Sequence, residues 1–456
     1  MEAKKPNIIL INADDLGYGD LGCYGSAVND TPHIDRMAAE GLRFTDFYSA
    51  APICSSSRGA LMTGCYPRRI GFGMFDGNHV LFPGQRVGLN PNEITIAKLL
   101  KSAGYATMHI GKWHCGDQPE FLPTRHGFDS YYGLPFSNDM GRQCNRRENM
   151  LPPLPLLLDE SVIEQQPDQA ALTSRYTEQA VRFIRENKNG PFFLYLAHMH
   201  VHLPHYAPER FIKASRNGPF GAAVACMDWS CGVILRELAE QGLDEDTLVI
   251  FTSDNGARTT EGGSNAPLAG GKATTQEGGF RVPFIMRRPG HVPAGVCNGL
   301  VAAMDVYPTL ANMAGAKIPT DRTIDGADFS PLLRGQPSGR DTFFYYMNDA
   351  LCAVRNGKWK LAALRGNWTK CEPVNELYDL ETDIGETDNV YEKHPEAVAA
   401  LTALLEKCRA DLGDSAAGKT GNDIRPSGCV DNPTTLTQYD PTHPYYMAIY
   451  DLPDAG

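Results

Sequence analysis

Apolar residues along the chain fall into short continuous runs, and several of these runs end in polar or charged residues. The first run, Asn7-Ile-Ile-Leu-Ile-Asn-Ala-Asp-Asp15, closes in two acids. Such a run predicts a buried strand of a parallel sheet whose carboxyl end carries functional side chains. Residues 105–110, 192–198 and 247–253 form similar runs and predict further strands.

Segments with helical character lie between these runs. The stretch from Pro32 to Gly41 predicts a helix that Gly41 terminates. Residues 94–104, 173–187 and 222–241 predict three more helices. Helix alternates with strand through most of the chain, which predicts an α/β fold: a mixed, mostly parallel sheet with helices on both faces. In open sheets of this kind, ligands bind beyond the carboxyl ends of the strands.

The pattern changes after about residue 335. Short antiparallel strands are predicted at residues 342–347, 351–363 and 375–380. Asn356-Gly357 predicts a hairpin turn, and residues 394–412 predict an amphipathic helix. Residues 413–456 are rich in Gly, Pro, Asp and Thr and predict an irregular tail that wraps the surface. We therefore expect a large domain over 1–335 and a small α+β subdomain with its tail over 336–456.

Composition narrows the class of protein. The 456 residues are 42% hydrophobic and 21% charged, and the formal net charge is −12, without any dominant basic stretch. These values are typical of a soluble globular protein and argue against a nucleic-acid partner. No apolar run approaches the ~20 residues of a membrane-spanning helix, so no membrane span is expected. The twelve cysteines are scattered without a CxxC pair, which indicates neither a disulfide framework nor a zinc site.

The N-terminus gives a limited indication of location. Met1 to Pro6 lead directly into the first strand without the apolar stretch of a signal peptide. We therefore expect the chain to be either cytoplasmic or a mature form whose signal has been removed.

Two predicted strand ends carry candidate metal ligands. Asp14 and Asp15 close the first strand, and Asp254 and Asn255 follow the strand at 247–253. Four oxygen-bearing side chains at two strand ends suit a hard cation. The alternative is ordinary turn chemistry, because Asp and Asn are common at strand ends.

Three histidines alternate directly after the apolar run at residues 192–197. His198, His200 and His202 could suggest zinc, but no acidic or cysteine partner lies nearby in the sequence. His198 and His200 either line a substrate pocket or are simply packed in the interior.

The segment Cys54-Ser-Ser-Ser-Arg58-Gly-Ala-Leu-Met-Thr-Gly64 resembles the signature of the formylglycine-dependent type I sulfatases. That signature is Cys-x-Pro-x-Arg followed by small and apolar residues and Thr-Gly. The resemblance implies that a maturation enzyme oxidises Cys54 to formylglycine, whose hydrate attacks sulfur. Ser56 stands where the family usually has Pro, which leaves open which maturation system acts. Taken alone, Cys54 could equally be a structural thiol.

Two further motifs match the same family. Gly111-Lys-Trp-His114 implies that Lys112 contacts both the hydrate and a sulfate oxygen, and that His114 acts as a general base. The block Gly270 to Pro283 implies that Lys272 binds a sulfate oxygen and, with His202, stabilises the leaving oxygen. Within that block, Glu277 and Arg281 are expected to form a structural ion pair beneath the site.

The resemblance also assigns the remaining groups of the centre. Asp14, Asp15, Asp254 and Asn255, completed by the modified Cys54, would hold a calcium ion. Arg58 would hydrogen-bond the hydrate, and Asp254 could take the proton of the attacking hydroxyl. Arg58, Lys112 and Lys272 would supply the local positive field that the acidic chain otherwise lacks.

These motifs run from residue 7 to about residue 290 and resemble the arylsulfatase A and N-acetylgalactosamine-6-sulfatase branch of the alkaline phosphatase superfamily. The resemblance implies an alkaline-phosphatase-like catalytic sulfatase domain over 1–335 with a small C-terminal sheet. It implies a sulfated carbohydrate or aryl sulfate as substrate and a periplasmic or secreted location, a cytoplasmic one remaining possible. Substrate specificity is expected in the loop from Phe136 to Arg147 and in the tail. Candidate substrate contacts are Asp139, Arg142, His200 and His205.

Two other functions stay open at this point. A phosphonate or phosphodiester hydrolase of the same superfamily could share the Cys-x-x-x-Arg arrangement, but a second set of metal ligands is not evident. A sulfated-glycan binder that is never matured would follow if Ser56 spoiled the recognition motif.

Overall fold

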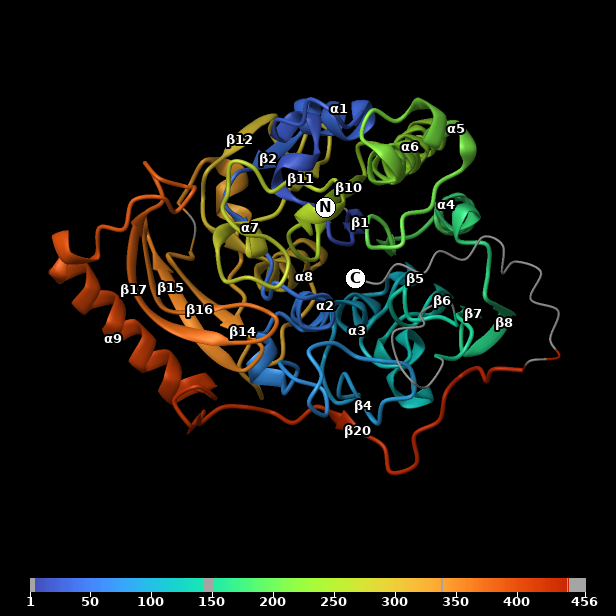
Figure 1. The fold of residues 1–456 in the computed structure, drawn as a ribbon. Coiled ribbons are helices and arrows are strands. Elements are labelled where there is room, and N and C mark those ends of the chain that lie inside the picture. The colour runs from blue at the N-terminus through green and yellow to red at the C-terminus, as the bar shows by residue number, and fades with distance from the viewer. Residues whose placement is uncertain (1–4, 143–150, 338, 441, 443–456) are drawn as a thin grey trace.

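The computed structural model describes residues 5–142, 151–337, 339–440 and 442. Its main feature is a ten-stranded sheet in the order β12-β2-β11-β10-β1-β9-β5-β6-β7-β8 (Figure 1). The strands are β1 (Asn7–Ala13), β2 (Leu42–Phe44), β5 (Ala106–Gly111), β6 (Ser130–Gly133), β7 (Pro155–Leu158), β8 (Ser161–Gln165), β9 (Phe192–Ala197), β10 (Thr247–Ser253), β11 (Phe284–Arg287) and β12 (Gly295–Cys297).

The centre of this sheet is parallel and its flanks are mixed. Strands β10, β1, β9, β5 and β6 run parallel to one another. Strand β11 pairs antiparallel with both β10 and β2, and β7 pairs antiparallel with β6 and β8. The prediction of a mixed, mostly parallel sheet is confirmed, because the continuous apolar runs occupy its doubly covered centre.

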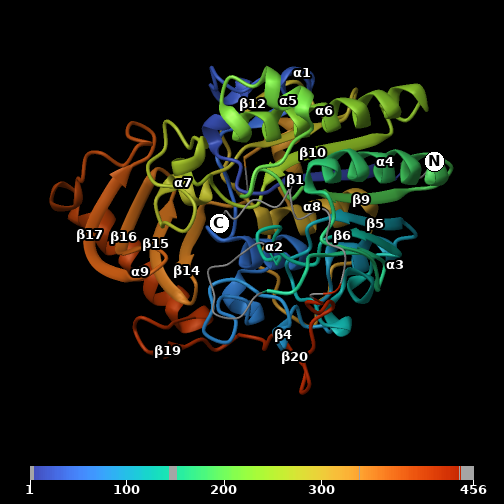
Figure 2. The same ribbon diagram turned by 45° about the vertical axis from the view of Figure 1, so that its right-hand side comes forward.

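Helices cover both faces of the sheet (Figure 2). One face packs on α1 (Pro32–Glu40), α4 (Gln169–Asn187) and α6 (Gly218–Glu240). The other packs on α2 (Cys54–Thr63), α3 (Ile96–Ser102) and α8 (Val306–Ala314). Two short helices are α5 (Glu209–Ala214) and α7 (Glu277–Phe280).

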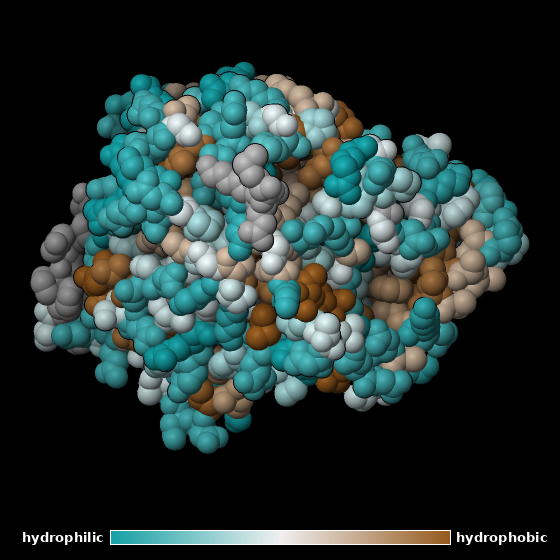
Figure 3. Space-filling view, turned by 180° about the vertical axis from the view of Figure 1, so that it is seen from behind, coloured by the Kyte–Doolittle hydropathy of each residue, from teal (hydrophilic) through white to brown (hydrophobic). Residues whose placement is uncertain are grey.

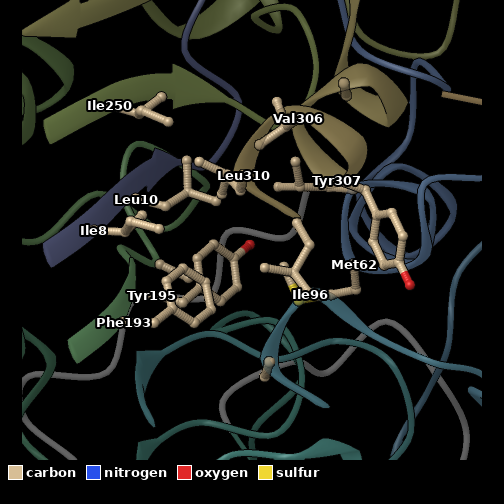
Figure 4. Close-up of a cluster of buried hydrophobic side chains, with 14 of the residues drawn as sticks. Ile8, Leu10, Met62, Ile96, Phe193, Tyr195, Ile250, Val306, Tyr307 and Leu310 are labelled. Atoms are coloured by element: carbon tan, nitrogen blue, oxygen red, sulfur yellow. The ribbon is translucent and has the colours of Figure 1, made fainter. Parts of the chain in front are cut away.

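Alternate residues of β1 enter the two cores. Ile9 and Ile11 join the core under α4 and α6, whereas Ile8 and Leu10 join the core over α8. Figure 4 shows the second core, where Ile8 and Leu10 lie near Leu310 of α8. Burying both faces of β1 fixes the register of the strand, and therefore the position of the acids that follow it.

A four-stranded antiparallel sheet forms the C-terminal part. Its strands are β14 (Thr342–Met347), β15 (Ala350–Asn356), β16 (Trp359–Gly366) and β17 (Cys371–Asp379), in chain order. The predicted hairpin between β15 and β16 is present, and Gly357 adopts φ +56° there. Helix α9 (Pro395–Leu412) packs along this sheet (Figure 1).

Three short strand pairs complete the fold. They are β3 (Phe47–Tyr48) with β13 (Val301–Ala302), β18 (Gly413–Asp414) with β19 (Lys419–Thr420), and β4 (Val87–Gly88) with β20 (Gly428–Cys429). The last pair returns the chain beyond α9 to the large sheet's side of the molecule. The domain division at residue 335 stays a prediction, as does the wrapping role of the tail.

Helix α6 is long and apolar enough by composition to cross a membrane, although 67% of its most apolar window is buried inside the protein. Burial of this kind is also found in core helices, so the expected absence of a membrane span stays a prediction. Seen from behind, the surface is mainly polar with separate apolar patches (Figure 3). Every cysteine in the described part of the chain is free of disulfides.

Candidate active site

The site lies beyond the carboxyl ends of β1 and β10. These parallel strands pair in register, with Ala13 opposite Ser253, so Asp14 and Asp254 leave the sheet side by side. Asp15 turns the chain with φ +59°, a left-handed conformation that an aspartate adopts more readily than most residues. The structure thus brings these three acids together at one edge of the sheet.

Asp14, Asp15, Cys54 and Asp254 form a buried cluster. One potential ligand atom of each lies within 4.8 Å of the corresponding atoms of the others. Carboxylates this close in a buried site repel one another unless cations compensate them. The oxygen donors suit a hard cation such as calcium.

The side-chain amide of Asn255 tests whether a calcium ion fits this site. Its Nδ2 donates a hydrogen bond to Asp15 Oδ1 at 2.7 Å, while its buried Oδ1 has no hydrogen-bond partner. A buried amide oxygen left without a partner is costly. An oxygen-seeking cation beside Asp15 would satisfy it, so the four predicted ligands and Cys54 fit a calcium ion.

Cys54 is the first residue of α2, and the preceding Ile53 is extended. The thiol is 1% exposed, and its Sγ lies 3.4 Å from Asp14 Oδ1 and 3.8 Å from Asp15 Oδ1. Burial, reinforced by the nearby Asp14 and Asp254, raises the pKa of the Cys54 thiol well above its usual value. The unmodified thiol is therefore a poor nucleophile, because a thiolate would be required.

Three cations meet the three carboxylates. Arg58 donates from Nε to Asp254 Oδ2 at 2.9 Å and from Nη1 to the Lys112 carbonyl at 2.8 Å. The Lys112 ammonium pairs with Asp14, and Lys272 Nζ lies 2.8 Å from Asp15 Oδ2. With the charges balanced three against three, an added divalent cation would leave the centre positive and suited to an anion.

The surroundings shift the pKa values of Asp15 and Asp254 in opposite directions. Burial tends to raise the pKa of Asp15, but Lys272, His202 and Lys112 outweigh it, and the pKa falls below its usual value. For Asp254, burial and the charge of Asp14 raise the pKa to about 6.

Gly111 sets the position of Lys112. It adopts φ +103°, and a Cβ there would lie 1.8 Å from the Ala197 carbonyl oxygen of β9. Glycine lets the chain turn tightly at the end of β5. His114 adopts a left-handed backbone conformation with φ +59°, as Asp15 does. Its Nε2 lies 3.0 Å from the carbonyl oxygen of Leu81.

Two histidines near the centre are neutral in the folded protein. Burial lowers the pKa of His114 well below its usual value, and burial with the neighbouring Lys272 lowers that of His202 to about 4. If His114 Nε2 donates to the Leu81 carbonyl, its Nδ1, which has no hydrogen-bond partner, remains available to accept a proton. His202 Nε2 lies 3.8 Å from Asp15 Oδ2, on the Lys272 side of the cluster.

Ser137 is a member of the site that the sequence did not single out. Its Oγ accepts from Lys112 Nζ at 3.1 Å and lies 3.4 Å from His202 Nε2. It follows β6, the strand beside β5, so its place at the sheet edge depends on the strand order. The proposed specificity loop begins one residue earlier, but its part at 143–147 lies outside the described residues.

The candidate substrate contacts differ in their surroundings. His200 is 1% exposed, with no hydrogen bond to either ring nitrogen, and Asp139 is also buried. His205 is partly buried, with Nε2 3.1 Å from the Val201 carbonyl oxygen, and Arg142 is partly buried. Their substrate roles stay predictions. In the part of the chain that the structure describes, no metal-ligand cluster includes His198, His200 or His202.

Glu277 is a fully buried carboxylate in the same sequence block as Lys272. Arg281 Nη1 lies 3.7 Å from Glu277 Oε2, as the predicted pair requires, but Arg281 also pairs with Asp46 at 3.0 Å. A closer cation for Glu277 is Lys360 of β16, at 3.0 Å. This contact was missed because it joins residues 83 positions apart.

Comparisons with known proteins agree with this geometry. The family described as Sulfatase matches residues 6–316, and that described as N-sulphoglucosamine sulphohydrolase, C-terminal, matches residues 271–411. Arylsulfatase A of Homo sapiens is 40% identical, covering 90% of this chain and 89% of its own. N-acetylgalactosamine-6-sulfatase of Mus musculus is 40% identical, covering 86% and 78%.

The solved structure of Ps i-CgsB in complex with k-i-k-neocarrahexaose has a TM-score of 0.78 and 32% identity, covering 89% of this chain and 92% of that one. The fold is thus the expected alkaline-phosphatase-like one with its separate C-terminal sheet. The acids, the cysteine and the cations that resemble the family signature all meet at one edge of that sheet. The chain belongs to the sulfatase family and is a hydrolase of sulfuric esters.

Proposed function

We propose that this sulfatase hydrolyses sulfate monoesters of carbohydrates or aryl alcohols, using formylglycine made from Cys54 and a bound calcium ion. The observation that carries the proposal is the position of Cys54. It is the first residue of α2 and faces Asp14 and Asp15, with Arg58, Lys112 and Lys272 around the same cluster.

The residues present suggest a division of labour. Formylglycine would supply a geminal diol as nucleophile, and calcium would draw charge from the sulfuryl oxygens. Lys112 and Lys272 bind sulfate oxygens, and Arg58 orients Asp254 through its 2.9 Å hydrogen bond. Asp254 accepts the proton of the attacking hydroxyl.

Release of the alcohol and release of sulfate each involve a further group of the site. His114 Nδ1 accepts the proton that accompanies release of sulfate, because burial keeps this imidazole neutral. Lys272, with His202 beside it, stabilises the leaving oxygen. Lys272 suits this role because its pKa is raised by Asp15 despite the burial, so the ammonium stays protonated.

Other features of the proposal draw on relatives. The Ps i-CgsB complex contains a carrageenan oligosaccharide, and this supports a sulfated glycan as substrate here. A maturation enzyme acting on Cys54 is the implied protein partner. A periplasmic or secreted location is proposed, since the relatives of this family mostly work outside the cytoplasm. Asp139, Arg142, His200 and His205 remain the proposed substrate contacts.

The test begins with the peptide that contains Cys54. Protein co-expressed with a sulfatase-maturing enzyme should show the mass of the aldehyde in place of the thiol, and should release sulfate from 4-nitrophenyl sulfate. Cys54→Ala should retain its fold and lose all turnover. Retained turnover in Cys54→Ala would exclude this nucleophile.

The two alternative functions give different outcomes. A faster rate on a phosphodiester than on a sulfate monoester would favour the phosphonate or phosphodiester hydrolase. Saturable binding of a sulfated glycan without turnover, in protein whose Cys54 stays unmodified with every class of maturation enzyme, would favour a binder.

A further inference from the structure

The hairpin between β16 and β17 carries an exposed tryptophan beside the proposed leaving-group site. Trp368 is 36% exposed, and the Lys272 ammonium lies 6.0 Å from the centroid of its ring. Single exposed apolar side chains are common on protein surfaces and need no function. Trp368 differs because one face of its ring is directed towards a cation of the active centre.

The position of the hairpin is fixed by backbone contacts to the Lys272 loop. Gly366 donates to Thr275 Oγ1 at 2.9 Å, and its carbonyl accepts from the Thr275 backbone N–H at 3.2 Å. A Cβ on Gly366 would lie 2.9 Å from both Met347 Cβ and Thr275 Cγ2. The base of the hairpin therefore lies flush against the loop that also carries Lys272.

The tip of the hairpin is a tight turn rather than a flexible loop. Asn367 Oδ1 accepts hydrogen bonds from the backbone N–H groups of Thr369 at 2.9 Å and Lys370 at 3.2 Å. The Asn367 backbone N–H also donates to the Lys370 carbonyl at 2.9 Å. Such a turn holds the Trp368 backbone before any ligand arrives, which lowers the entropy cost of binding.

A second ring supports the indole. His79 lies edge-on to Trp368, with ring centroids 5.7 Å apart and an interplanar angle of 70°. Asn348, in the turn between β14 and β15, holds His79 through a contact of 2.9 Å between Asn348 Nδ2 and His79 Nδ1. With Nδ1 as acceptor, the His79 proton is on Nε2 and available to a polar ligand group.

The direction of the reaction places the alcohol part of the substrate on this side. Residue 54 would attack sulfur, so the leaving oxygen points away from it, towards Lys272 and His202. A ring attached to that oxygen starts beside Lys272 and comes within reach of Trp368. The π face of an indole is electron-rich and packs well against the C–H groups of a pyranose or the edge of an aryl ring.

We infer that Trp368, braced by His79, is the platform on which the ring of the substrate's alcohol part packs. This rests on the proposed function and extends it, because the tryptophan selects ring-bearing sulfate monoesters over small acyclic ones. It acts on binding of the ester and leaves recognition of the sulfate group itself to the buried centre.

The test separates ring binding from sulfate binding. The full chain with Cys54→Ala, which stops turnover, is titrated calorimetrically in calcium with inorganic sulfate, 4-nitrophenyl sulfate and galactose 6-sulfate. We expect at least one ester to bind more tightly than inorganic sulfate. Adding Trp368→Ala should weaken that ester about tenfold, a typical loss for an aromatic contact, and leave inorganic sulfate unchanged. Trp368→Phe should restore most of the affinity.

The control is Lys370→Ala, which removes an exposed residue of the same turn that pairs with Glu372 at 2.6 Å. It should leave all three affinities unchanged. Equal weakening of sulfate and ester by Trp368→Ala, no weakening at all, or a parent that binds neither ester more tightly than sulfate would overturn the inference. Failure of the parent to bind any of the three ligands would instead overturn the proposed function. Which ester gains more from Trp368 distinguishes an aryl from a sugar ring.

Discussion

The Lys360 ammonium lies 3.0 Å from the Glu277 carboxylate, and neither side chain is exposed. Lys360 Nζ also donates to the Thr275 carbonyl at 3.0 Å and pairs with Glu386 at 2.9 Å. One buried lysine of the C-terminal sheet therefore holds the segment that follows Lys272. The C-terminal sheet thus supports the catalytic loop directly.

Lys360→Met should destabilise the protein by about 3–5 kcal/mol, because it leaves Glu277 charged and buried without its nearest cation. In the wild type, burial raises the pKa of Glu277, but Lys360, Arg281 and Arg355 together lower it to about 2, so the carboxylate is ionised while Lys360 is present. Urea unfolding followed by circular dichroism measures the loss.

The matched control is Lys358→Met, which removes a partly exposed pair with Asp379. Its loss should be about 1 kcal/mol or less. Equal losses in the two variants would contradict a special role for the buried pair.

His126 should make the folded state sensitive to acid. Burial lowers its pKa from 6.5 to about 3, and the ring packs 5.5 Å from that of Trp113. Between these pH values the unfolded chain binds a proton that the folded chain does not, so stability falls as pH drops below 6.5. The variant His126→Phe cannot bind this proton in the unfolded state and does not lose stability in this way. Its stability relative to the wild type should rise by about 1.4 kcal/mol per pH unit from pH 6 towards pH 4.

Chemical unfolding at several pH values measures this difference. His291→Phe, at an exposed position, is the control and should run parallel to the wild type. A difference between His126→Phe and the wild type that stays constant with pH would rule out the titration.

Calcium should stabilise the folded protein through the acids at the sheet edge. At a calcium concentration about a hundredfold above the dissociation constant, the gain is about 2.7 kcal/mol, seen as a higher Tm that chelation reverses. Asp15→Asn should abolish most of this shift. Asp30→Asn, which changes an exposed acid, should keep it. An unchanged calcium shift in Asp15→Asn would place the ion elsewhere.

Lys272→Ala should slow the reaction most for poor leaving groups. A sugar alkoxide needs its developing charge stabilised, so kcat on a sugar sulfate should fall about 10²-fold or more. The loss on 4-nitrophenyl sulfate should be smaller, since nitrophenolate leaves without help. Steady-state kinetics on both esters measure the ratio, and Lys213→Ala, at an exposed position, is the control. Equal losses would assign Lys272 to sulfate binding alone.

The sequence predicts those features that depend on local patterns. Apolar runs that end in acids located β1 and β10, and parallel register then brought Asp14 and Asp254 together. Ser56 also shows a limit of local reading: its Oγ donates to the Phe72 carbonyl at 2.8 Å, a bond that a proline at this signature position would lack.

The missed features depend on packing between distant segments. Lys360 reaches Glu277, and Gly366 reaches Thr275, across 83 and 91 positions. Neither the periodicity of apolar residues nor the spacing of motifs in the sequence predicts such contacts. Ser137 joined the site through the position of its strand in the sheet, which becomes visible only when the strand order is known.

The burial of Cys54 limits the time during protein synthesis in which this residue is accessible to an enzyme. Arg58 and Asp254, which are joined by a hydrogen bond in the buried centre, are 196 positions apart, and β1 lacks its neighbour β10 until the ribosome has passed residue 253. At about 5–20 residues per second, that interval lasts on the order of 10–40 s. Under the proposed function, a maturation enzyme competes with folding for Cys54 during this window. The active fraction of the protein would then be set by relative rates, and slower translation between the two segments would increase it.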